Sequence, residues 1–122
     1  MRSLWAGVVV GLAVPFGAAF AQPVAVRELA LVDGVLPVAQ RLIVAKQGDV
    51  QRWRLTSNLP GEVHVHAYRV SVTLQPGQAG ELAFTAHASG RFRVEWHAAG
   101  AASTSSAAHH APAPAVLEVR PR

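Results

Sequence analysis

Residues 62–74 of this chain read Glu-Val-His-Val-His-Ala-Tyr-Arg-Val-Ser-Val-Thr-Leu, an alternation of apolar and polar side chains. A period of two is typical of a β-strand with one buried face, because successive strand residues point to opposite sides. The apolar residues occupy odd positions up to Ala67 and even positions from Val70 onwards. We therefore expect a bulge near Tyr68 and Arg69, or a crossing of the strand from one sheet to the other.

Similar alternating runs recur along the chain, and no stretch after the N-terminal segment shows sustained helical periodicity with end caps. Turn-forming sequences such as Asp33-Gly34 and Gln47-Gly48-Asp49 separate the runs. About seven short strands in one small domain favour an all-β sandwich of two sheets. The expected strands cover residues 25–32, 41–46, 50–57, 62–74, 80–86, 90–97 and 115–120.

The N-terminal segment has the features of an export signal. Arg2 precedes an apolar run, and Ala19-Phe20-Ala21 matches the small-residue pattern of a signal-peptidase site. We expect residues 1–21 to be a signal peptide cleaved after Ala21, and residues 22–122 to form one periplasmic or secreted domain. The alternative is an uncleaved anchor, which would be this chain's contact with a membrane.

Composition excludes several classes of protein. The chain has no cysteine, so no disulfide stabilises it, and its formal net charge is +4. The arginines are spread over several strands without interleaved exposed aromatic residues, which argues against nucleic-acid binding. No serine stands in a nucleophile motif, and carboxylates such as Glu95 look isolated, so we expect no enzymatic activity.

The histidines carry the clearest chemical signal. His64 and His66 are two residues apart in an alternating run, so a strand places both imidazoles on the same face. Imidazole is a good ligand for zinc, copper, nickel and iron. The pair is therefore a candidate half of a metal site.

Several segments together resemble the cupredoxin-like domains of exported bacterial proteins, related to those of periplasmic iron-uptake proteins of the EfeO type. The resemblance runs from about Arg41 to the C-terminus and implies a Greek-key cupredoxin-like β-sandwich. Two positions depart from the family: Ala67 stands where a glycine is usual, and Arg69 where an aspartate is usual. The segments that carry it are Gln47-Gly48-Asp49-Val50, Leu55-Thr56-Ser57, residues 62–68, Leu74-Gln75-Pro76-Gly77, residues 82–86, residues 90–97 and residues 117–121.

The resemblance does not imply a blue-copper protein. Blue-copper sites use two histidines, a cysteine thiolate and a weak axial methionine. This chain has no cysteine, and its single methionine is Met1. When residues 90–94 are laid on the strand that leads to the cysteine in blue-copper domains, Trp96 falls at the cysteine position. Copper-thiolate electron transfer is thereby excluded.

The histidines of this chain could still form a metal site without cysteine or methionine. In cupredoxin-like folds the loop before the last strand faces the end that carries the histidine segment, and here that loop spans residues 98–114, a flexible stretch of small residues. Glu62 would be able to add a carboxylate, and such a site suits Cu(II) or Zn(II). The candidate ligands are His64, His66, His97, His109 and His110.

The alternative reading is structural. Histidines on a half-exposed strand are often ordinary surface residues or hydrogen-bond a neighbouring loop. In that case the chain is a metal-free interaction module that binds another envelope protein through a sheet edge or an end loop.

Overall fold

The computed structural model describes residues 11, 13, 15, 17, 18, 24–100 and 113–122. Ala21, the expected cleavage position, lies outside these residues, as do His109 and His110. Within them, no helix is both long and apolar enough to cross a membrane. The elements are β1 (Val26–Leu31), η1 (Val38–Gln40), β2 (Leu42–Lys46), β3 (Val50–Ser57), β4 (Gly61–Val65), η2 (His66–Tyr68), β5 (Val70–Leu74), β6 (Gly80–Thr85), β7 (Gly90–Ala98) and β8 (Ala115–Arg120).

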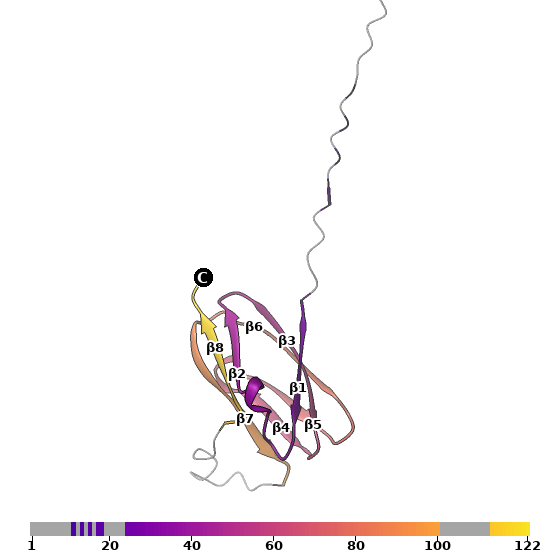
Figure 1. Cartoon of the computed structure of the whole chain (residues 1–122), viewed down its shortest axis with the longest axis vertical. Helices are drawn as coiled ribbons and strands as arrows, with labels where there is room; N and C mark the ends of the chain where they lie inside the picture. Colours follow the sequence, from indigo (N-terminus) through magenta and orange to yellow (C-terminus); the bar gives the residue numbers. More distant parts are fainter. Residues whose placement is uncertain (1–10, 12, 14, 16, 19–23, 101–112) are drawn as a thin grey trace, which may run out of the picture.

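The strands form a sandwich of two sheets (Figure 1). The smaller sheet has the order β1-β3-β6, and the larger has the order β2-β8-β7-β4-β5. β1 pairs with β3 in parallel, and β2 pairs with β8 in parallel, while the remaining pairs are antiparallel. The predicted all-β sandwich is confirmed.

Alternation along each strand builds the core between the sheets. In β3, Trp53 and Leu55 are each only 1% exposed, whereas Arg52 and Arg54 between and beside them face solvent. Trp53 packs edge-on against Phe84 of β6, with ring centroids 5.1 Å apart. Each fully buried aliphatic or aromatic side chain contributes about 1.5–3 kcal/mol of transfer free energy. Packing of the core therefore stabilises a fold that has no disulfide.

The prediction of one continuous strand over residues 62–74 is wrong. The stretch folds back on itself: β4 and β5 are antiparallel neighbours, joined by the single 3-10 turn η2. Arg69 ends this turn in the left-handed conformation, with φ 52° and ψ 39°. The change of apolar phase is therefore neither a bulge nor a crossing between sheets, because each arm of the hairpin restarts its own alternation toward the core.

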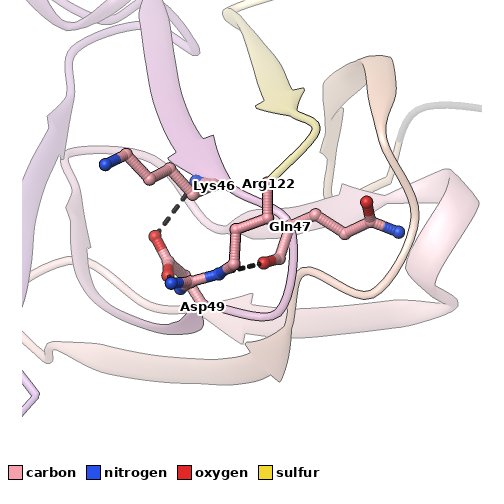
Figure 2. A network of polar contacts seen from close by, with 4 residues as sticks. All are labelled: Lys46, Gln47, Asp49 and Arg122. Carbon is pink, nitrogen blue, oxygen red and sulfur yellow. Dashed lines mark hydrogen bonds and ion pairs between the residues drawn. The ribbon is translucent and has the colours of Figure 1, made fainter.

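The turn between β2 and β3 is held by polar contacts that reach the C-terminal residue (Figure 2). Asp49 Oδ2 accepts a hydrogen bond from the Lys46 backbone N–H at 3.0 Å, which confirms the expected turn role of this residue. Arg122 donates to the Gln47 carbonyl at 2.9 Å and lies 2.6 Å from Asp49 Oδ1. The chain after β8 is thereby tied to the start of β3.

Trp96 of β7 packs on two glycines from different parts of the chain. A Cβ added at Gly34 would lie 2.5 Å from Trp96 Cδ1, and one added at Gly61 would lie 2.5 Å from Trp96 Cη2. Such distances are shorter than van der Waals contact, so only glycine fits under the indole at either position. The tryptophan that the resemblance sets at the blue-copper cysteine position is thus packed against the backbone of two other segments.

Candidate metal centre

Two strands of the larger sheet place a histidine and a glutamate side by side on its outer face. In β4, Val63 and Val65 are buried, so His64 between them points outward and is half-buried. In β7, Val94 is buried, and Glu95 points to the same outer side as His64. His64 and Glu95 are direct partners in the antiparallel β4–β7 register. Side chains at such paired positions start from Cβ atoms about 5 Å apart.

The turn η2 brings the second histidine to this face. His66 is exposed and begins the turn, and the Arg69 backbone N–H donates to its carbonyl at 3.2 Å. Tyr68 closes the turn from inside: its ring packs against Phe84 and Phe92, and its hydroxyl donates to the Ala88 carbonyl at 2.7 Å. Burial raises the pKa of the Tyr68 phenol. The turn that carries His66 is therefore anchored in the core.

The resulting group has three ligand atoms in close proximity. One nitrogen each from His64 and His66 and one oxygen of Glu95 all lie within 4.8 Å of one another. The two imidazole rings meet edge to face, with centroids 5.5 Å apart. Donors around one tetrahedral ion lie about 3.4 Å apart when each bond is about 2.1 Å long. The upper limit on the separation of the three donor atoms is therefore about 1.4 Å larger than this spacing.

His97 lies beside this group without belonging to it. Its ring centroid is 6.2 Å from that of His64, and its Nε2 is 3.6 Å from Glu95 Oε2. Glu62 is its cross-strand partner on the same outer face. The carboxylate among the three close donors comes from Glu95, not from Glu62. His97 is thus placed to hold Glu95 or to act as a further ligand.

The remaining histidines fall into two classes. His87 packs edge-on against Tyr68, with its Nδ1 3.2 Å from the Thr85 carbonyl, and it is not part of the group. His109 and His110 lie outside the described residues, so their predicted role stays a prediction.

Glu95 is the residue that sequence reasoning missed. It was read as an isolated carboxylate because it stands about thirty positions after His64 in the chain. The available signal was its place in the run Val94-Glu95-Trp96-His97, where Glu95 and His97 share the outward phase. That signal becomes informative only when the register between β4 and β7 is known.

This donor set fits a divalent transition metal and excludes a blue-copper centre. Two imidazoles and one carboxylate form the ligand set of several zinc enzymes and of non-haem iron sites, in which further coordination positions stay open. The chain has no cysteine thiolate. The three donors lie on a partly exposed sheet face, so an ion held there would remain accessible to solvent and to exchange.

Comparison with known proteins supports the fold. No protein-family model and no curated protein matches the sequence. Among solved structures, a chain of a heme-copper terminal oxidase dimer aligns with TM-score 0.59 and 19% identity, covering 77% of this chain and 65% of that one. The sequence therefore spans slightly less than two thirds of that chain.

Two further structures are similar over most of their own length. The periplasmic domain of subunit II of cytochrome oxidase (CoxB) of Bradyrhizobium japonicum has TM-score 0.56 and 16% identity, covering 77% of this chain and 82% of that domain. A copper binding protein solved in its apo form has TM-score 0.53 and 15% identity, covering 82% and 93%. Likenesses at such low identity show architecture alone, and the architecture that they show is a cupredoxin-like β-sandwich.

Proposed function

We propose that this protein is an exported, non-catalytic domain that binds a divalent transition metal, Cu(II) or Zn(II), through His64, His66 and Glu95. The observation that carries the proposal is the convergence of two imidazole nitrogens and a carboxylate oxygen within 4.8 Å. His97 is proposed as an auxiliary ligand because it lies next to both Glu95 and His64. His109 and His110 remain candidates from the sequence.

The exposure of the group supports handling of an ion more than permanent storage. Structural zinc sites usually have four protein ligands and are closed to solvent, whereas three ligands leave a position for water or an exchanging ligand. His66 is exposed, and the Glu95 side chain is 24% exposed. The apo copper binding protein with a similar fold and the resemblance to domains of periplasmic iron-uptake proteins both agree with a role in metal handling.

Calorimetric titration of the domain comprising residues 22–122 with Cu(II) and Zn(II) tests the proposal. We expect a dissociation constant below about 10 μM for at least one ion, which corresponds to about −7 kcal/mol. Substituting His64→Ala or Glu95→Gln should weaken binding by about 100-fold, since even loss of a residue that only supports a ligand costs 10–100-fold.

The matched control is His87→Ala, which removes an exposed histidine that lies apart from the group. A His109→Ala/His110→Ala variant then measures the contribution of the loop histidines. The proposal fails if neither ion binds more tightly than about 10 μM. It also fails if His64→Ala/His66→Ala binds as well as the unaltered chain.

A second candidate role is that of a metal-free interaction module. β1 and β2 are edge strands of their sheets, and several valines on this side are exposed, among them Val26 at 46%, Val44 at 38% and Val50 at 47%. Exposed apolar residues at strand edges favour contact with another chain. Concentration-dependent sedimentation that is abolished by Val44→Lys would support this role, whereas monomeric behaviour throughout would oppose self-association.

A further inference from the structure

A hollow opens directly beside the metal-binding group. It has a volume of about 220 Å³ and shares two residues, His66 and Glu95, with that group. Its other lining residues are Ala67, Arg91, Phe92 and Arg93. Sites for drug-sized molecules run from about 300 to 1,000 Å³, so this hollow suits a smaller ligand.

The hollow exists because β4 ends earlier than β7. The β4–β7 ladder stops at the Val65–Val94 pair, where η2 leaves the sheet. β7 continues past this point toward Gly90, paired with β8 on its other side. The side chains at 91–93 are therefore flanked by the turn instead of a strand, and the gap between turn and strand forms the hollow.

The charges around the hollow favour an anion once a metal is present. Arg93 lies 3.7 Å from Glu95, and Arg91 lies 3.3 Å from Glu118. Glu118 also accepts a hydrogen bond from Arg120 at 2.8 Å, which lowers the pKa of its carboxyl. Arg91, Arg93 and Arg120 thus all lie close to Glu95 or Glu118, and a divalent ion at Glu95 would add two further positive charges to this face.

We infer that this hollow is a subsite for a small carboxylate ligand, which completes the coordination of the ion at one end and contacts Arg93 at the other. The inference rests on the proposed function and specifies the bound species as a metal–carboxylate pair. A guanidinium matches a carboxylate in shape and charge. The ring of Phe92 and the methyl group of Ala67 suit the hydrocarbon part of such a ligand better than they suit phosphate.

The experiment measures Cu(II) affinity of the whole domain with and without butyrate, a carboxylate that chelates copper only weakly by itself. We expect butyrate to raise the apparent Cu(II) affinity by about fivefold or more, and Cu(II) to raise butyrate affinity by the same factor, because coupling between two ligands is reciprocal. Butyrate labelled with ¹⁷O at its carboxyl oxygens should broaden the electron spin resonance of bound Cu(II), which reports direct coordination.

Arg93→Gln should abolish the butyrate effect while the chain still binds Cu(II) alone. Arg54→Gln, which alters an exposed arginine of the other sheet, is the matched control and should retain the full effect. Formate should be less effective than butyrate because it lacks an apolar body.

The outcomes separate the two proposals. If Cu(II) binds and butyrate changes nothing, the carboxylate subsite is overturned and the metal site stands. An undiminished butyrate effect in Arg93→Gln, or an equal effect of inorganic phosphate, also overturns the subsite. If neither Cu(II) nor Zn(II) binds with or without butyrate, both proposals are overturned together.

Discussion

The two faces of strand β7 differ in polarity: the inner face carries packed apolar side chains, and the outer face carries polar side chains that can ligate a metal. On the inner face, Val94 is 2% exposed and Trp96 packs on Gly34 and Gly61. On the outer face, Glu95 lies beside His64, and the His97 side chain is 48% exposed. In the alignment that the resemblance implies, Trp96 stands at the position of the blue-copper cysteine, and in this structure its indole packs on the two glycines.

The difference shows that the two faces of one strand can meet separate requirements. A strand sends adjacent residues to opposite faces, so replacing an inward ligand leaves the outward neighbours unaffected. The inward position must satisfy close packing, and the outward ones need only reach each other across the sheet. We therefore expect substitutions on the two faces to separate stability from metal binding.

The largest expected effect is on the inner face. Trp96→Ala should lower the free energy of unfolding by about 3 kcal/mol, since large-to-small changes at packed aromatic residues cost this order. Glu95→Gln should change it by less than about 0.5 kcal/mol in the absence of metal, as is usual for partly exposed positions. Urea unfolding of both variants provides the measurement. Equal losses in the two variants would contradict the division between faces.

Acidification should weaken metal binding by the group on the outer face. A histidine nitrogen must lose its proton to bind a metal, so lower pH weakens binding. With two histidine ligands, affinity should fall toward a limit of about 100-fold per pH unit once both are protonated. Calorimetric titrations across a series of pH values measure this slope. A slope that is unchanged in His66→Ala would show that His66 is not a ligand.

Tyr68→Phe tests the link between the core and the turn that carries His66. Loss of the hydrogen bond to Ala88 should cost about 1 kcal/mol of stability. Because burial raises the pKa of Tyr68, an unfolded chain ionises first as the solution becomes alkaline. The neutral phenol therefore makes its full contribution to the free energy of unfolding below about pH 10. This contribution is lost as the pH rises through the pKa of Tyr68 in the folded state.

Measuring the free energy of unfolding at neutral and at alkaline pH checks this prediction. In Tyr68→Phe, the free energy of unfolding should decline less at alkaline pH, because no phenol is present to ionise. Tyr68 is the only tyrosine of the chain, so ultraviolet titration of tyrosinate reports it directly. An unshifted titration would show that the phenol is not held in the core.

Arg69→Asn should have the smallest effect, and it should be stabilising. Arg69 has φ 52°, a left-handed conformation that costs most residues about 1–2 kcal/mol and that asparagine tolerates better. A gain of about 0.5 kcal/mol in thermal or urea unfolding is the expected outcome, a fraction of that strain. Ser71→Asn, at an exposed strand position, is the control and should give no gain.

The strands were largely readable from sequence because alternation is a local signal. The expected strand over residues 50–57 coincides with β3 (Val50–Ser57), and the one over 115–120 coincides with β8 (Ala115–Arg120). The stretch 62–74 was misread because its turn contains neither glycine nor proline. The change of apolar phase located an irregularity near Tyr68 and Arg69, but no residue type there indicates that the chain reverses.

The candidate site was predicted only in part, for a related reason. His64 and His66 stand out by their spacing, although the reason for their proximity was wrong, since His66 lies in the turn and not on the strand. Glu95 entered the group through the pairing of β4 with β7, which a single sequence does not state. That register is fixed by packing, with Val63 opposite Trp96 and Val65 opposite Val94 on the buried side.

The sequence alone determined the all-β class, the alternation of apolar and polar side chains in its strands, and the absence of a thiolate, because each depends on residue type and on neighbours a few positions away. Only the tertiary structure decided that His64, His66 and Glu95 meet and that Trp96 lies over Gly34 and Gly61. Both juxtapositions join residues far apart in the chain, and they are selected by how the two sheets bury their apolar faces.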